Sequence, residues 1–145
     1  DNRTTAMTGR QGNPFNGETL QHRPSRELDM EGVIRAIGVE DVRTVDPNDM
    51  KAVRLALREA TRFDELSVIV FRSPCVLIDR IKKPVYVVAD TCTACGVCST
   101  LGCPAIATRE EDGHAIIDAS QCIGCGQCAQ YCAFKSIVST AKEGE

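Results

Sequence analysis

Eight of the nine cysteines lie in two short runs in the last third of the chain. In each run three cysteines are separated by two residues, and a fourth follows after three or four more. The runs are Cys92, Cys95, Cys98 and Cys103, and then Cys122, Cys125, Cys128 and Cys132. Three thiolates at this spacing can hold three corners of a cubane from one tight loop. The pattern therefore indicates iron–sulfur chemistry.

The fourth corner of each cubane must come from elsewhere in the chain. In two-cluster ferredoxins the fourth cysteine of each run ligates the other cluster. We therefore predict two [4Fe–4S] clusters with exchanged fourth ligands. One would be held by Cys92, Cys95, Cys98 and Cys132, and the other by Cys122, Cys125, Cys128 and Cys103.

The two runs depart from the usual spacing in two details. The first has four residues before its fourth cysteine, and we expect the extra residue, among Ser99–Gly102, to bulge without loss of the ligand. The second has Ala133 where the first has Pro104, which removes stiffness but no ligand. The glycines inside the runs, Gly96, Gly124 and Gly126, keep the loops small, so that backbone N–H groups can approach the cluster sulfurs and tune the potential.

Two alternatives for the cysteines are disfavoured. Structural zinc sites prefer pairs of Cys-x2-Cys separated by a gap, not triplets. A disulfide framework is typical of secreted chains, and the N-terminus has no secretory signal pattern. No apolar run approaches the length of a membrane span. We therefore expect a cytoplasmic protein with no membrane partner.

Composition argues for a folded chain and against nucleic acid as a partner. Apolar residues make up 43% of the 145 residues, enough for a packed core, whereas aromatic residues make up only 4% and tryptophan is absent. Residues 90–145 carry 3 basic and 7 acidic side chains, a net charge of −4. A phosphate backbone would be repelled by that segment.

The cysteine runs need a scaffold of short strands. Residues 85–88 form an apolar run that leads into the first loop, and Asp112–Gly113 is typical of a hairpin turn. Ile137 and Val138 could pair back against the first strand. Residues 83–145 are therefore predicted to be a small α+β domain of the two-cluster ferredoxin type.

The first part of the chain has a different pattern. Residues 1–28 are polar and lack periodicity. A helix then begins after Asp29, with Val33, Ile34 and Ile37 on one apolar face, and ends at Gly38. A short strand follows at residues 42–45.

A second helix is predicted to open at Asp46–Pro47, with Met50, Val53, Leu57 and Ala60 buried. The continuous apolar run 68–71 indicates a strand buried on both faces. The order helix–strand–helix–strand is typical of a parallel α/β sheet, and we assign residues 1–82 to this α/β domain.

The opening segment, DNRTTAMTGRQ at residues 1–11, resembles the second half of the thiamine-diphosphate motif. Its Met-Thr-Gly-x-Gln stretch is similar to that of the 2-oxoacid:ferredoxin oxidoreductases. Together with the cysteine runs, the whole chain resembles the large (alpha) subunit of the indolepyruvate ferredoxin oxidoreductases. Because the chain begins inside this motif, we expect it to be the C-terminal piece of a longer subunit.

The resemblance implies a cofactor site that is only partly present. Asn2 would supply a side-chain ligand to Mg²⁺ and Thr4 a main-chain carbonyl, both oxygen ligands that suit this hard cation. Thr8 and Gly9 would lie beside the diphosphate of thiamine diphosphate. The upstream carboxylate and the catalytic acid are absent, so no catalytic residue is assigned and this chain alone lacks a complete active site.

The resemblance also implies a reaction and partners. The reaction is oxidative decarboxylation of an aryl 2-oxoacid such as indolepyruvate to an acyl-CoA, with CoA as co-substrate and electrons passed to an external ferredoxin. A smaller beta subunit would complete the complex. Two other hypotheses remain. One is a stand-alone two-cluster electron-transfer module of another redox complex, and the other is clusters that only support an interface.

Three further residues have weaker signals. Cys75 lies outside the runs and either contacts an intermediate or a cluster, or is an idle thiol, and we favour the second. His22 and His114 have no partner at metal-ligand spacing, and we expect both to be solvated or structural.

Overall fold

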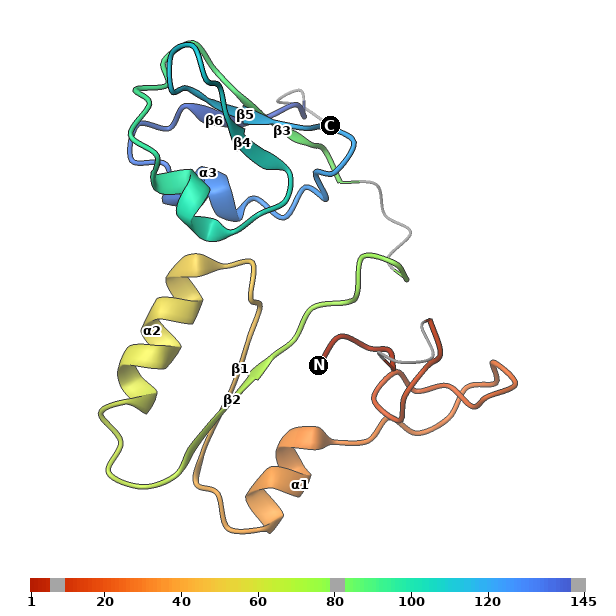
Figure 1. Cartoon of the computed structure of the whole chain (residues 1–145). Helices are drawn as coiled ribbons and strands as arrows, with labels where there is room; N and C mark the ends of the chain where they lie inside the picture. Colours follow the sequence, from red (N-terminus) through yellow and green to blue (C-terminus); the bar gives the residue numbers. More distant parts are fainter. Residues whose placement is uncertain (6–9, 79–82, 142–145) are drawn as a thin grey trace. The chain divides into compact units, whose positions relative to one another are not determined.

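The computed structural model describes residues 1–5, 10–78 and 83–141. The chain divides into two compact units, residues 1–80 and residues 81–145, coloured red to green and green to blue in Figure 1. Thr8 and Gly9, predicted to lie beside the diphosphate, fall outside the described residues. In the described part of the chain, no helix is long and apolar enough to cross a membrane.

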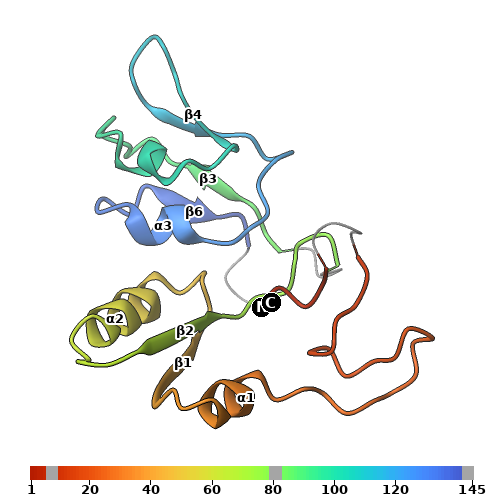
Figure 2. The same ribbon diagram turned by 60° about the horizontal axis from the view of Figure 1, so that its bottom comes forward.

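The first unit contains two helices and a pair of parallel strands. Its elements are α1 (Met30–Ala36), β1 (Asp41–Val45), α2 (Met50–Ala60) and β2 (Ser67–Phe71). Val42 of β1 is paired with Val68 of β2 in parallel register. Figures 1 and 2 show α1 on one side of this strand pair and α2 on the other. The parallel pairing and the element order confirm the α/β prediction.

The start of α1 was predicted correctly and that of α2 was not. Asp29 caps α1, because its carboxylate accepts the N–H of Gly32 at 2.9 Å. The predicted opening of the second helix at Asp46–Pro47 is wrong. Asp46 instead forms a turn by accepting the N–H of Asn48 at 2.8 Å, and Asp49 caps the helix with the N–H groups of residues 51 and 52.

Burial in the first unit is lower than the sequence pattern indicated. In α2 the buried residue is Ala56, whereas Leu57, predicted to be buried, is exposed. Ile37 is 77% exposed, so the predicted apolar face of the first helix is largely uncovered. In β2 only Val70 is buried and Phe71 is exposed. The prediction of a strand buried on both faces is wrong, because the three residues before Val70 are only half-buried and Phe71 after it is exposed.

The second unit is built from two antiparallel strand pairs. β3 (Tyr86–Val88) pairs with β6 (Ile137–Ser139), and β4 (Ile106–Thr108) pairs with β5 (Ala115–Ile117). The pairing of the last strand with the first was predicted. The hairpin between β4 and β5 was also predicted, and Gly113 in its loop has a φ of 74°.

Two short helical segments follow the cysteine loops of the second unit. The first loop leads into a 3-10 turn, η1 (Val97–Leu101), and the second into α3 (Gln127–Tyr131). The two lie next to each other, with η1 turquoise and α3 blue in Figure 1. The extra residue of the first run is absorbed by the tighter η1 and by Gly102, which has a φ of 64°.

The core of the second unit is small. Cys98, Ala115 and Ile137 form its cluster of buried apolar residues, and parts of the strands and several other cysteines pack around them. Two of these positions are on strands and one is a predicted cluster ligand. The same side chains therefore form the core and the candidate metal site.

Candidate functional sites

The two cysteine loops have the same backbone conformation. In each, the third and fifth residues counted from the first cysteine have positive φ: Ala94 at 54° and Gly96 at 72° in the first loop, and Gly124 at 70° and Gly126 at 74° in the second. Gly96 and Gly126 also precede the helical turns η1 and α3. Alternating left-handed residues curl the chain into a concave loop lined by N–H groups, a shape suited to an anionic cluster.

One pocket of the second unit is lined by Cys92, Cys95, Cys98 and Cys132, the four predicted ligands of the first cluster. Its other walls include Phe134 and Ser136 at the approach to β6. Cys98 is buried and Cys95 is exposed, so the pocket extends from the core to the surface. The fourth thiol thus reaches the first triplet from the second run.

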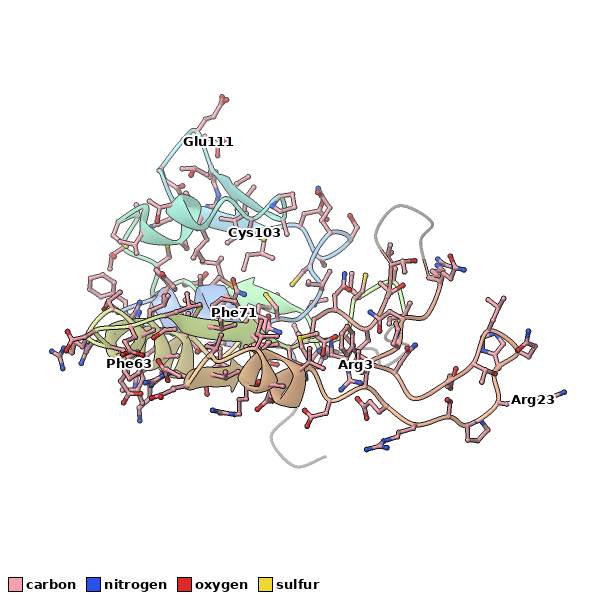
Figure 3. All side chains as sticks on the ribbon, turned by 90° about the horizontal axis from the view of Figure 1, so that it is seen from below. Arg3, Arg23, Phe63, Phe71, Cys103 and Glu111 are labelled. Atoms are coloured by element: carbon pink, nitrogen blue, oxygen red, sulfur yellow. The ribbon has the colours of Figure 1, made fainter. Side chains whose placement is uncertain are left out.

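The pKa of Cys128 relates this thiol to the other three cysteines of the second predicted ligand set. Burial, together with the charges of neighbouring Cys125, Cys122 and Cys103, raises the pKa of the Cys128 thiol to about 11. Cys103 belongs to the first run, yet it acts on Cys128 together with the second triplet. Figure 3 shows Cys103 within the cysteine-rich unit, with Glu111 away from it at the tip of the β4–β5 loop.

Two thiols of the first group have opposite environments. Burial raises the pKa of the Cys98 thiol, and the adjacent thiolates of Cys92 and Cys95 add to this. Burial acts in the same direction at Cys132, but hydrogen bonds outweigh it and lower its pKa. The donors include the backbone N–H of Ser136, 3.3 Å from the sulfur of Cys132. This thiolate is therefore stabilised before any metal arrives.

The donor set fits iron–sulfur clusters. All nine cysteines are free thiols, and thiolates are the ligands that such clusters require. Among the described residues, no three His, Cys, Asp or Glu side chains converge closely enough to hold a single metal ion. The structure instead distributes the thiols around a hollow and over two loops.

Two contacts of the second loop were missed by sequence reasoning. A Cβ atom at Gly124 would lie 2.6 Å from the carbonyl oxygen of Pro84 and 2.7 Å from Cβ of Lys83. A Cβ atom at Gly126 would lie 2.7 Å from the hydroxyl of Tyr86. The segment that enters β3 thus packs directly on this loop. These contacts join residues about forty positions apart in sequence, so no local pattern could have revealed them.

The candidate cofactor residues of the first unit lie beside the end of β2. The Asp1 nitrogen donates to the carbonyl of Phe71 at 2.8 Å, and the N–H of Cys75 donates to the carbonyl of Asn2 at 3.0 Å. The carboxyl ends of parallel strands are where α/β sheets bind ligands. Asn2 is therefore positioned at the edge where a cofactor site is expected.

Asn2 and Thr4 are held together. The side-chain oxygen of Asn2 accepts the N–H of Thr4 at 3.2 Å, and the hydroxyl of Thr4, a buried residue, donates to the carbonyl of Gln11 at 2.9 Å. An amide oxygen has two lone pairs and can accept this bond while it ligates a cation. The residues present therefore fit part of a Mg²⁺ site, to which Asn2 would add one oxygen and Thr4 its carbonyl.

A buried carboxylate supports this turn. The side chain of Asp1 has no solvent exposure and accepts a hydrogen bond from Arg72 Nε at 2.9 Å. It also accepts the N–H of Arg3 at 3.2 Å. The N–H of Ser73 donates to the Asp1 carbonyl at 3.1 Å. These bonds fix the turn to the chain that follows β2. Neither Asn2 nor Thr4 lines the groove of about 1020 Å³ that is formed by Arg3, Ile78 and side chains from residues 10–36.

The three residues with weaker signals, Cys75, His22 and His114, have different surroundings. Cys75 is half-buried, and its backbone lies against Asn2, so the structure places this thiol in the neighbourhood of the cofactor residues. His22 is exposed and lies 3.3 Å from Glu18. His114 lies 2.9 Å from Asp112 in the β4–β5 loop. Each histidine therefore has a carboxylate partner.

Comparison with protein families divides the chain at the same region as the structure. Residues 1–71 match the model of the thiamine pyrophosphate enzyme C-terminal TPP binding domain. Residues 84–133 match the model of a 4Fe-4S dicluster domain. The chain thus carries part of a thiamine diphosphate-binding domain followed by a domain for two [4Fe–4S] clusters. The fold class and these two cofactors agree with the sequence prediction.

Two curated relatives match most or all of the chain, and a third matches about a third of it. The indolepyruvate oxidoreductase subunit IorA of Thermococcus kodakarensis is 40% identical over 154 aligned positions, which cover 100% of this chain and 24% of the relative. That of Methanothermobacter marburgensis is 38% identical and covers 91% of this chain and 22% of the relative. A ferredoxin-like protein in the nif region of Bradyrhizobium diazoefficiens is 36% identical over 55 positions, 34% of this chain and 73% of that protein. The chain therefore spans about a quarter of the length of the first two relatives.

Proposed function

Because this chain belongs to the family of the indolepyruvate oxidoreductase subunits IorA, we propose that it is the electron-transfer portion of a 2-oxoacid:ferredoxin oxidoreductase. The reaction would be the oxidative decarboxylation of an aryl 2-oxoacid such as indolepyruvate to an acyl-CoA, with CoA as co-substrate. Electrons would leave through the two clusters to an external ferredoxin. A smaller beta subunit would complete the complex, and free thiols favour the cytoplasm.

The observation that carries this proposal is the pocket lined by Cys92, Cys95, Cys98 and Cys132. It supports a first cluster with the exchanged ligand set, and the effect of Cys103 on Cys128 supports the reciprocal set for a second. The residues of this chain would hold the clusters, supply N–H donors to their sulfurs and shield them. Asn2 and Thr4 would hold Mg²⁺ at the diphosphate, and thiamine diphosphate supplies the carbanion chemistry when bound.

Ligand exchange is tested with one substitution in each run. Cys132→Ser should damage the cluster of the first triplet, and Cys103→Ser that of the second, after anaerobic reconstitution of the whole chain. Paramagnetic resonance of the reduced protein, with Cys95→Ser and Cys125→Ser to assign the signals, measures which cluster is lost. Loss of the second-triplet signal in Cys132→Ser would contradict the assignment.

The cofactor role is tested in the longer subunit, because the site here is partial. Asn2→Ala removes one oxygen from a cation that tolerates little loss of octahedral geometry. The thiamine diphosphate concentration needed for 2-oxoacid-dependent dye reduction should rise at least about tenfold, since loss of one bond to a charged group costs about 1.5–3 kcal/mol. Both clusters should still assemble.

Asn13→Ala, in the same polar segment, is the matched control. Asn13 caps a local turn, with its side chain on the N–H of Phe15 at 3.1 Å, and it has no proposed contact with the cofactor. Identical titration curves for Asn2→Ala and wild type would remove the thiamine role and leave the alternative of a stand-alone two-cluster electron-transfer module.

A further inference from the structure

Ser136 is the most buried residue of the second unit, with 1% of its surface exposed, and its side chain is polar. It lies four residues after Cys132 and directly before β6. A buried hydroxyl is costly unless its hydrogen bonds are made, so its partners show what it holds in place.

Every polar group of Ser136 bonds to a segment that carries a proposed ligand of the first cluster. Its N–H donates to the sulfur of Cys132 at 3.3 Å. Its hydroxyl donates to the carbonyl of Thr91 at 2.9 Å and accepts from the hydroxyl of Thr91 at 3.1 Å. Its carbonyl accepts the N–H of Ala89 at 2.7 Å. Thr91 directly precedes Cys92, so the bonds between Ser136 and Thr91, 45 residues apart, connect the segments of the first and the fourth ligand.

The corresponding position in the other half of the unit has no hydroxyl. Ala105 precedes β4 as Ser136 precedes β6, and it is also buried, with 3% exposed. The carbonyl of Ala105 accepts the N–H of Asp118 at 2.8 Å, which corresponds to the bond between Ser136 and Ala89. The backbone arrangement is therefore repeated, but the buried hydroxyl at this position is found only on the side of the first cluster.

We propose that Ser136 is a positioning residue for the first cluster. The hydroxyl of Ser136 holds Thr91, and its backbone N–H holds the sulfur of Cys132. These bonds form a clamp, and the fourth ligand is thereby kept in position beside the first triplet. The inference rests on the ligand sets of the proposed function. Hydrogen bonds to cluster sulfurs are among the factors that set reduction potential, and they stabilise the more negative, reduced cluster. The clamp therefore raises the potential of the first cluster and slows its loss.

The test is Ser136→Ala in the reconstituted chain, with Ser139→Ala on β6 as the matched control. Ser139 donates no bond to a cysteine segment, and its hydroxyl accepts the N–H of Ala141. In Ser136→Ala the potential of the first cluster, measured by redox titration with paramagnetic resonance, should shift to a more negative value. Iron release from that cluster to a chelator should be about tenfold faster, because the part-buried hydrogen bond to the Thr91 carbonyl is lost. The second cluster is the internal reference.

The outcomes separate this inference from the function on which it rests. No difference between Ser136→Ala and Ser139→Ala would overturn the clamp while both clusters stand. A shift confined to the second cluster would overturn the ligand assignment instead, and protein without acid-labile sulfide would overturn the proposed function. Ser136→Thr keeps the hydroxyl and should restore the wild-type potential.

If the Ser136→Ala protein assembles neither cluster, a milder substitution tests the proposal. Thr91→Val removes only the hydroxyl that donates to Ser136 and leaves the Thr91 carbonyl as acceptor. A smaller shift of the first cluster in the same direction, with the second unchanged, supports the clamp. Equal changes in both clusters, or none, overturn it.

Discussion

The contact between the second cysteine loop and the chain that enters β3 gives a prediction with a calculable magnitude. Gly124 has a φ of 70°, so alanine there pays a backbone cost of about 1–2 kcal/mol. Its Cβ would also lie 2.6 Å from the Pro84 carbonyl oxygen and 2.7 Å from Cβ of Lys83. Backbone must move to relieve these contacts, which costs about 1–3 kcal/mol more. We therefore expect Gly124→Ala to destabilise the unit by about 2–5 kcal/mol.

Gly96 provides the matched control, because it isolates the backbone cost. Its φ is 72°, it lies in the equivalent loop of the first cluster, and a Cβ there would have nothing within 4 Å. Gly96→Ala should therefore cost only the first of the two contributions. The difference in unfolding free energy between the two variants therefore measures the cost of displacing the Lys83–Pro84 segment.

The assay is anaerobic thermal unfolding of the reconstituted chain, followed by cluster absorbance. A difference of about 1–3 kcal/mol corresponds to an apparent midpoint about 4–24 °C lower for Gly124→Ala than for Gly96→Ala. Paramagnetic resonance should show that the second cluster is lost first in Gly124→Ala. Equal midpoints for the two variants would refute the packing argument, because both share the positive φ and only one has the contacts.

Three further predictions follow from the second unit. Gly126→Ala should lower the stability of this unit, and Tyr86→Phe should restore part of the lost stability because it removes the hydroxyl 2.7 Å from the new Cβ. Thermal midpoints of the single and double variants measure this, and a double variant with no recovery would contradict it. Iron binding by the apo-protein should accelerate as pH rises from about 7 to 9. The raised pKa values of Cys98 and Cys128 keep these thiols protonated at neutral pH, and iron binds the thiolate form. A binding rate in stopped-flow that does not change with pH would contradict this prediction. Iron removal should abolish the protease resistance of residues 83–141, because the core there is small; resistant apo-protein would contradict it.

Two features encoded within a few residues were predicted correctly from the sequence. The Asp29 cap of α1 depends on a bond between residues three positions apart, and the hairpin at Asp112–Gly113 depends on a glycine with positive φ. The family of the chain and its two cofactors were predicted from the cysteine spacing and from the opening segment. The fourth-ligand exchange and the roles of Asn2 and Thr4 are still predictions, because they concern bound groups.

Features that depend on distant residues were not predictable in the same way. The burial of Leu57 and Phe71 depends on what covers α2 and β2, which the hydrophobic pattern does not specify. The start of α2 is a local feature that was also misjudged, because Asp46 forms a turn that competes with helix initiation at Pro47. Ser136 gave no signal at all, because its role depends on Thr91, 45 residues away.

The duplicated loops explain how one backbone design can support two unequal clusters. The curl of both loops is the same, but the first is approached by the β4–β5 loop, where a Cβ atom at Gly113 would lie 3.5 Å from Cβ of Ala94. The second loop is covered at Gly124 by the segment before β3. Only the first group has the hydroxyl of Ser136 near its fourth thiolate. Because hydrogen bonding and exposure set cluster potential, we expect clusters held in these repeated loops with unequal surroundings to differ in reduction potential.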